Sequence, residues 1–574
     1  MKALVVFSLF ALLLAASSFA SGAIVEYSFT VKDLNVTRLC KTQTITTVNG
    51  MVPGPIIDVR ENDTLVIHVF NGSPHNITLH WHGIFQIRSQ WADGPDYITQ
   101  CPIRPGHKYT YRFTITGQEG TLWWHAHAGL LRAYVHGALI IRPRPGFLYP
   151  FPKPYEEVPI ILAEWWKSTD LNKIFKQIQV NGVPPSDAFT INGMPGDLYN
   201  CPHDPIFKLK VKQGKTYLLR IINANLVAQM FFKVANHKFT VVAVDAAYTT
   251  PYITDVVVIA PGQTTDVLLK ANQPTGSYYM ASSAYASAPG PPAGPPFDTT
   301  TTRGIVVYKG ASHDHKGHPL MPIMPAFNDT SLAHKFYSNL TGLSGGPHWL
   351  DCPSEVDERM FITCGLSLDF CPKNANCVGP NKTALSASMN NVSFVTPSNS
   401  GSSILEAFYR NKPEGVYTRD FPNHPPEFFD FVSPNITLDF IKIFAPKSTK
   451  VKTLKFNSTV EIVFQNVVFL GAENHPMHLH GFDFYVLAQG FGVYSASRDT
   501  KNFNVMNPQR RNTIAVPAGG WAVIRFKANN PGIWFVHCHI DGHLPLGLAM
   551  AFEVQNGPTP ETSLPPPPPD LPKC

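Results

Sequence analysis

The sequence predicts an all-β protein made of several consecutive β-sandwich or barrel domains. Short runs rich in Val, Ile, Thr, Tyr and Phe are bounded by turn residues, few segments have the periodicity of an amphipathic helix, and one β unit recurs three times along the chain. Such runs are typical of sandwiches and barrels. The 574 residues are enough for three or four domains of about 100–200 residues each.

The composition is that of a folded protein with a low charge density. Charged residues make up 15% of the chain, against about 25% in an ordinary soluble domain. Hydrophobic residues reach 44% and aromatic residues 12%, which excludes a disordered chain or a coiled coil. The net charge of +6 is too small for this length to indicate a nucleic-acid partner.

The first 23 residues are predicted to be a secretory signal peptide. Lys2 precedes a short apolar run, and small residues suited to cleavage follow at Ser18 and Ala20 or at Ser21 and Ala23. No later segment has the roughly 20 apolar residues that a membrane-spanning helix needs. We therefore expect an exported protein with no membrane association.

The β unit can be followed in order along the chain. The clearest strands are expected at residues 63–71, 238–246, 252–260 and 458–466. TLVIHVFN precedes LHWHG, and TVEIVFQN precedes HPMHLHG; later in each copy come WHAHAG and VHCHIDG. The middle copy has YYMAS where the other two have WHAHA and VHCHI. The first and third copies therefore carry histidines that the middle copy lacks.

Segments rich in Pro and Gly predict the domain boundaries. One spans residues 143–154 and another spans residues 288–302. We expect domains at residues 24–143, 155–310 and 421–574, the last with a C-terminal tail. Residues 311–420 are expected to form a long irregular connection that contains four cysteines: Cys352, Cys364, Cys371 and Cys377.

Two further features agree with export. Ten N-x-Ser/Thr sequons predict N-glycosylation, although Pro74 weakens the one at Asn71. They lie at Asn35, Asn62, Asn71, Asn76, Asn328, Asn339, Asn381, Asn391, Asn435 and Asn457. The nine cysteines are an odd number, so at least one should have a role other than pairing.

Four His-x-His pairs are the main chemical signal. Alternate residues of a strand project to one face, so each pair presents two imidazoles together. Eight imidazoles suit copper, zinc, iron or nickel, whereas a single pair would more often be an ordinary polar strand. The pairs are His80 with His82, His125 with His127, His478 with His480, and His537 with His539.

Cys538 lies inside the last pair and should point to the opposite face. His475 lies upstream, and His543 and Leu548 follow downstream. One thiolate with two imidazoles is the trigonal set of blue-copper sites, whose weak axial position is often Met; here it would be Leu548. The alternative is a buried thiol or half of a disulfide. The odd cysteine count favours the metal site because it leaves eight cysteines to pair.

The motifs HWHG, WHAHAG, HPMHLHG and HCHIDGHLPLGLAM resemble those of blue multicopper oxidases, and of plant laccases in particular, over nearly the whole mature chain. The resemblance implies three cupredoxin-like Greek-key domains and four copper ions per chain. It assigns His475, Cys538 and His543 to type 1 copper with Leu548 axial and non-coordinating, His80 and His478 to type 2, His82, His125 and His539 to one type 3 ion, and His127, His480 and His537 to the other.

The resemblance implies further roles. Asp93 and Asp541 would supply protons, and His543 would receive electrons through an exposed edge in a shallow surface pocket. Two long-range disulfides would join Cys40 to Cys201 and Cys101 to Cys574. The four cysteines of the irregular segment would pair among themselves in one of three ways.

The family further implies a laccase, a benzenediol:oxygen oxidoreductase. It would take single electrons from phenols such as monolignols and lignin-related compounds, and reduce dioxygen to two waters. Leu548 in place of Met favours donors that are hard to oxidise, because a missing thioether raises the reduction potential. Ascorbate oxidases typically carry Met at this position, which counts against ascorbate as donor. An ascorbate oxidase or metallo-oxidase remains the alternative, and a non-catalytic wall protein is a third. We expect a monomer in the plant apoplast or cell wall.

Overall fold

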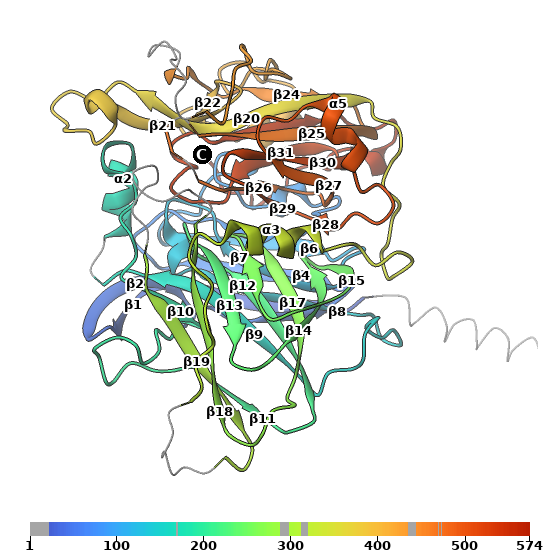
Figure 1. The fold of residues 1–574 in the computed structure, drawn as a ribbon. Coiled ribbons are helices and arrows are strands. Elements are labelled where there is room, and N and C mark those ends of the chain that lie inside the picture. Colours follow the sequence, from blue (N-terminus) through green and yellow to red (C-terminus); the bar gives the residue numbers. More distant parts are fainter. Residues whose placement is uncertain are drawn as a thin grey trace, which may run out of the picture.

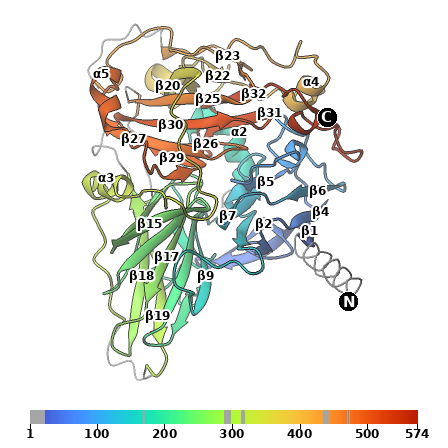
Figure 2. The same cartoon turned by 90° about the vertical axis from the view of Figure 1, so that its right-hand side faces the viewer.

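The computed structural model describes residues 22–167, 170–286, 298–311, 319–433, 443–468, 470–471 and 473–574. These residues form three β-sandwich units, and in Figure 2 the third unit (orange to red) lies above the first (blue) and the middle one (green). The predicted all-β architecture is confirmed. Nearly all of the predicted signal peptide, and Asn435, lie outside the described residues.

The first unit packs two four-stranded sheets around a core that includes Val31, Leu65 and Trp124. One sheet has the order β2 (Lys41–Val48), β1 (Ile24–Arg38), β4 (Thr64–Asn71) and β6 (Lys108–Thr114). The other has the order β3 (Ile57–Arg60), β8 (His136–Arg142), β7 (Gly120–Ala126) and β5 (Leu79–His82). Short 3-10 turns η1 (Gln90–Ala92) and η2 (Leu131–Ala133) follow β5 and β7 along the chain.

The middle unit packs a six-stranded sheet on a five-stranded one (Figure 1). The first has the order β10 (Ala188–Ile191), β9 (Glu156–Trp165), β12 (Thr216–Asn223), β17 (Thr264–Lys270), β14 (Phe239–Val244) and β15 (Ala247–Thr254). The second has the order β11 (Lys208–Val211), β19 (Thr301–Tyr308), β18 (Ser277–Tyr285), β13 (Gln229–Val234) and β16 (Val257–Ile259). The unit also contains helix α2 (Leu171–Asn181), which packs against the third unit.

The third unit has the same plan. Its six-stranded sheet has the order β21 (Ala384–Met389), β20 (Glu358–Asp369), β25 (Ser458–Val467), β30 (Gly520–Ala528), β27 (Phe484–Phe491) and β28 (Arg510–Arg511). Its five-stranded sheet has the order β24 (Val451–Leu454), β32 (Ala549–Val554), β31 (Gly532–Cys538), β26 (His475–Leu479) and β29 (Thr513–Val516). The remaining elements are β22 (Ser393–Phe394), β23 (Lys447–Ser448), α3 (Thr330–Ser338), α4 (Ile404–Tyr409), α5 (Ala496–Asp499), η3 (Pro380–Lys382), η5 (Thr500–Asn502) and η6 (Pro560–Thr562).

Two expectations about the strands need correction. The segment 311–420 is not wholly irregular, because β20 and β21 join the sheet of the third unit and β20 runs parallel to β25. Alternate residues of β20, among them Met360, Ile362 and Cys364, face that unit's core. The strand expected at 252–260 is divided between β15 and β16, which belong to different sheets. Thr254 accepts a hydrogen bond from the amide of Val256 and so marks the change of sheet.

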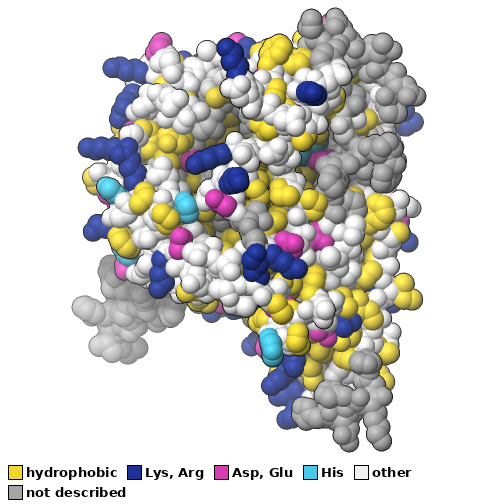
Figure 3. Space-filling model, turned by 90° about the vertical axis from the view of Figure 1, so that its left-hand side faces the viewer, with side chains coloured by type: hydrophobic (Ala, Val, Ile, Leu, Met, Phe, Trp, Pro, Cys, Tyr) yellow, Lys and Arg dark blue, Asp and Glu magenta, His cyan; other side chains and the backbone are white. Residues whose placement is uncertain are grey.

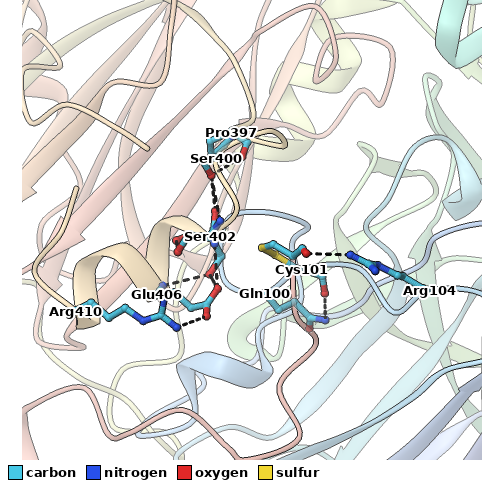
Figure 4. The surroundings of a disulfide bond; sticks show 10 residues. Gln100, Cys101, Arg104, Pro397, Ser400, Ser402, Glu406 and Arg410 are labelled. Atoms are coloured by element: carbon cyan, nitrogen blue, oxygen red, sulfur yellow. Dashed lines mark hydrogen bonds and ion pairs between the residues drawn. A yellow bond between two sulfur atoms is a disulfide. The ribbon is translucent and has the colours of Figure 1, made fainter. Parts of the chain in front are cut away.

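Three disulfides join segments of the described chain. Cys40 is bonded to Cys201 and Cys101 to Cys574, as the family resemblance implied. Figure 4 shows Cys101 near helix α4, and Arg104 donates a hydrogen bond to the carbonyl of Cys574 (2.9 Å). Cys371 pairs with Cys377. The expected pairing of all four cysteines is therefore wrong for Cys352 and Cys364, which are free thiols.

The sequons differ in exposure. Asn35, Asn76, Asn328, Asn339, Asn381 and Asn457 are exposed, and Asn62 and Asn391 are half-buried. Asn71 is fully buried, and its amide donates hydrogen bonds to the carbonyls of His75 (2.7 Å) and Ile103 (2.8 Å). The folded chain therefore has no room for a glycan at Asn71, and that prediction is wrong.

The surface mixes side chains of all kinds. On the face shown in Figure 3, basic, acidic and apolar side chains of the described residues are interspersed. No helix within the described ranges is long and apolar enough to cross a membrane.

Candidate metal centre

Eight histidines from the first and third units meet in one buried cluster. His80 and His125 lie opposite each other on the paired strands β5 and β7. His478 and His537 do the same on β26 and β31. Each of these four histidines is followed two residues later by the second histidine of its His-x-His pair. All eight side chains are at most 7% exposed.

The eight side chains fall into groups that mix the two units. In each group the ligand atoms lie within 4.8 Å of one another. The groups are His80, His82 and His478; His82, His125 and His539; and His127, His480 and His537. The cluster therefore forms only when the first and third units face each other.

Hydrogen bonds fix which ring nitrogen of a histidine faces the cluster. Nδ1 of His80 donates to the carbonyl of Asp93 (2.7 Å) and Nδ1 of His478 donates to that of Asn512 (2.8 Å). Both leave a buried Nε2 with no hydrogen-bond partner among the described atoms. His82 is reversed: its Nε2 contacts the Oδ1 of Asn512 (3.0 Å), and its Nδ1 has no such partner.

The electrostatics also suit a metal. Burial, and then the neighbouring histidines, lower the pKa of His82, His478 and His480 well below the ordinary value. The neutral imidazole is the form that binds metals. Unpartnered nitrogen lone pairs facing one buried space are costly unless an ion or water satisfies them. The donor set therefore fits a cluster of imidazole-bound metal ions.

A second site lies beside the first. Cys538 is buried, and its Sγ lies 3.7 Å from Nδ1 of His475 and 3.5 Å from Nδ1 of His543. Leu548 is also buried, and its carbonyl accepts a hydrogen bond from the amide of Cys538 (3.0 Å). One thiolate and two imidazoles converging in a buried site fit the trigonal set of blue copper.

Comparisons with known proteins agree with this donor set. Family profiles described as multicopper oxidase match residues 30–146, 156–311 and 420–558. Laccase-7 of Arabidopsis thaliana is 59% identical over 568 residues, which cover 98% of each chain. Laccase-6 of Oryza sativa subsp. japonica is 53% identical over 578 residues, again 98% of each chain. The chain belongs to the plant laccases.

A solved structure supports the fold of this laccase. The crystal structure of the laccase from Botrytis aclada has a TM-score of 0.71 and is 26% identical, and the match covers 95% of this chain and 89% of that one. The three sandwich units are therefore cupredoxin-like domains.

The two acidic residues of interest have different partners near the cluster. Asp93 is fully buried, and its Oδ2 accepts a hydrogen bond from Nδ1 of His480 (2.9 Å) while its Oδ1 lies 3.4 Å from Nδ1 of His80. Asp541 instead pairs with Arg132 (3.1 Å). Burial raises the pKa of Asp541 to about 6, against the opposing effect of Arg132.

His543 is almost buried and lies against an acidic side chain. It is only 6% exposed, and its Nε2 lies 2.9 Å from Oε2 of Glu473. A small part of His543 remains exposed, so the exposed ring edge implied by the family resemblance stays a prediction. Burial alone would lower the pKa of His543, but Glu473 and Cys538 outweigh it and raise the pKa to about 10 in the metal-free protein.

Sequence reasoning missed several residues around these sites. Glu473 could have been noticed, because it lies two residues before His475. Asn512 and Thr513 contact His82 and His478, and Arg132 contacts His539. The motifs gave no sign of these three residues, since their contacts join segments that are far apart in the chain.

Proposed function

We propose that this laccase is a secreted enzyme that oxidises phenols, such as monolignols and lignin-related phenols, one electron at a time and reduces dioxygen to two waters. The observation that carries the proposal is the placement of Cys538. Its side chain belongs to the thiolate site, while its chain neighbours His537 and His539 belong to the eight-histidine cluster. A site that takes single electrons is thus joined by a few covalent bonds to a site that can collect several.

We assign four copper ions to the two sites. His475, Cys538 and His543 would hold type 1 copper, with Leu548 in the axial position. The remaining sets would be His80 and His478 for type 2, and His82, His125 and His539 with His127, His480 and His537 for the type 3 pair. Bound copper would supply the one-electron redox chemistry and the dioxygen site.

Half-buried apolar side chains support a phenolic donor. Val183, Val227, Leu366 and Leu385 pack against the core cluster that contains Cys538. Val183 also lies against Gly542, next to His543. Val183 offers an apolar contact for an aromatic ring, and Glu473 can accept the hydroxyl proton of a phenol whose electron leaves through His543.

Two buried acids would handle protons at the histidine cluster. Dioxygen reduction consumes protons, so acids in contact with the ligands matter. The carboxylate of Asp93 contacts both His80 and His480, and Asp541 follows His539 by two residues. We assign the proton supply to Asp93 and Asp541.

The second candidate is a metal-ion oxidase. Glu473 favours it, because a carboxylate beside His543 could bind a cation. However, a divalent cation takes several oxygen ligands, so one carboxylate makes a poor site. We rank this function below phenol oxidation.

The deciding experiment is dioxygen uptake by the copper-loaded protein with sinapyl or coniferyl alcohol, compared with ascorbate and ferrous iron. We expect fast uptake with the phenols alone. Uptake only with ascorbate or iron would contradict the proposed substrate class. No uptake with any donor, in a protein that retains copper, would support a non-catalytic wall protein.

We also propose export to the apoplast as a monomer. The N-terminal apolar run and six exposed sequons support export. Expression of the full chain in a plant secretory system, followed by deglycosylation and native mass measurement, tests location, glycan occupancy and oligomeric state together.

A further inference from the structure

Arg132 is a buried charge at the edge of the histidine cluster. It lies in η2, five residues after His127, and is 1% exposed. Burying a guanidinium is costly unless its donors are paired. The stability of the buried guanidinium therefore depends on the groups that pair with it.

The partners of Arg132 come from two other units. Its Nε lies 3.1 Å from Oδ2 of Asp541, and its Nη2 donates to the carbonyl of His539 (3.0 Å), both in the third unit. The same Nη2 donates to the carbonyl of Asn225 in the middle unit (3.0 Å). Its Nη1 lies against the ring of His539. One side chain of the first unit thus joins all three units.

The middle unit holds the same segment from the other side. The amide of Asp541 donates to the carbonyl of Leu226 (2.8 Å). The loop around Leu226 is itself fixed by Glu164, whose carboxylate accepts hydrogen bonds from the amides of Leu226 (2.7 Å) and Val227 (3.1 Å). The segment 539–541 is therefore clamped between Arg132 and a loop of the unit that has no cluster histidines.

Gly262 of the middle unit adds a steric constraint. Its φ is +89°, and a Cβ at this position would lie 2.8 Å from the ring of His539. The backbone of the middle unit therefore reaches the histidine as closely as a glycine allows. This contact limits how far the ring of His539 can move.

We propose that Arg132 is a positioning residue, which fixes His539 relative to Cys538 by clamping residues 539–541 to the loop 225–228 of the middle unit. The inference rests on the proposed function, in which Cys538 and His539 hold different copper ions. Any displacement of His539 would change the short covalent route between them.

The planar fork of arginine is what the clamp requires. Its nitrogens reach a carboxylate, two carbonyls and a ring in different directions, whereas a lysine ammonium is a point charge on a flexible stem. If only the positive charge mattered, Arg132→Lys would behave as the unchanged protein. If the fork matters, Arg132→Lys and Arg132→Gln should have similar defects.

Arg220 provides a matched control. It is also fully buried, it pairs with Glu157 (2.8 Å) and Asp266 (3.0 Å) of the middle unit, and it donates a hydrogen bond to the hydroxyl of Thr121 in the first unit (2.7 Å). None of these partners is a proposed copper ligand. Arg220→Lys therefore reports the general cost of weakening a buried inter-unit arginine.

The first measurement is amide hydrogen exchange in the full, metal-free protein, with attention to residues 536–548. We expect faster exchange there in Arg132→Lys and Arg132→Gln, and no change there in Arg220→Lys. The second is copper retention together with the visible absorption of the thiolate-bound copper. Altering a residue that supports a ligand lowers metal affinity or activity roughly 10–100-fold, so we expect loss of copper from the histidine cluster while the thiolate band persists.

Wild-type exchange and copper retention in Arg132→Lys would overturn the proposal, as would an equal rise in exchange in Arg220→Lys. If neither Arg132 variant accumulates, Asp541→Asn takes its place, since it removes the charge pair and keeps an oxygen acceptor. Faster exchange at 536–548 in that variant supports the clamp, and unchanged exchange contradicts it. The exchange measurement needs neither copper nor substrate, so it stands even if phenols are not the donors.

Discussion

The middle unit and the two outer units share one frame but use it differently. Strands β13 and β18 of the middle unit pair antiparallel, as β5 with β7 and β26 with β31 do. Where WHAHA and VHCHI place imidazoles, the middle unit has Tyr279 and Ala281 of YYMAS, and Met280 between them belongs to its hydrophobic core. The frame alone therefore does not make a metal site. The site needs histidines on two units that face each other, and a third unit to support them.

The largest expected effect separates the thiolate from an ordinary buried thiol. Cys538 and Cys364 are both buried, free and in the same core cluster. We expect Cys538→Ser to lose the visible copper absorption and all phenol turnover, because no thiolate remains to hold the ion. Cys364→Ser should keep both and lose only about 1–2 kcal/mol of stability. Absorption spectra and thermal unfolding measure these outcomes, and loss of the blue band in Cys364→Ser would contradict the assignment.

A second test compares a histidine of an outer unit with one of the middle unit. His478 has an unpartnered Nε2, whereas Nε2 of His237 contacts the hydroxyl of Tyr308 (2.8 Å) and its Nδ1 the carbonyl of Ala235 (2.6 Å). We expect His478→Ala to lose copper and most dioxygen reduction. His237→Ala should keep turnover and lose about 1–3 kcal/mol of stability from its broken hydrogen bonds. Copper analysis with unfolding curves checks both, and equal copper loss in the two variants would refute the distinction.

The sequence predicted those features that depend on local patterns of residues. Strand alternation and the repeated His-x-His frames indicated an all-β chain, and the structure brings these histidines together in one buried cluster. Two features depended instead on which residues lie close together in the folded chain. The contact between His543 and Glu473 had no signal in the motifs, and the parity of nine cysteines did not show that Cys352 and Cys364 stay unpaired. The role of Arg132 was hidden because its partners lie about 100 to 400 residues away.

A third prediction concerns Glu164 of the middle unit, which holds the loop that contacts residues 539–541. Burial raises the pKa of Glu164 to about 7, despite the hydrogen bonds from Val227 and Leu226 that oppose the rise. A carboxyl whose pKa is higher in the folded state than in the unfolded state contributes fully to stability at pH values below the unfolded-state pKa. That contribution is lost as the pH rises through the folded-state pKa. We expect the metal-free protein to lose up to about 3 kcal/mol between pH about 4.5 and 7 from this group. Urea unfolding across that range measures it.

Glu164→Gln provides the comparison for this pH effect. Glutamine keeps an oxygen that can accept from the loop amides but cannot titrate, so the decline in stability between pH about 4.5 and 7 should become shallower. An unchanged slope in Glu164→Gln would mean that other buried carboxyls, such as Asp541, produce the pH dependence.

The smallest expected effect tests the axial position of the thiolate site. Leu548 is fully buried, and Met has nearly the same volume, so Leu548→Met should change stability by less than about 1.5 kcal/mol. A thioether at this position tunes the reduction potential of such a site, and we expect a lower potential with slower oxidation of the phenols that are hardest to oxidise. Redox titration together with rates for a series of substituted phenols measures the change. If the potential stays the same while the blue absorption is retained, Leu548 does not lie in the axial position. Leu548 would then give no support for phenols over ascorbate as electron donors.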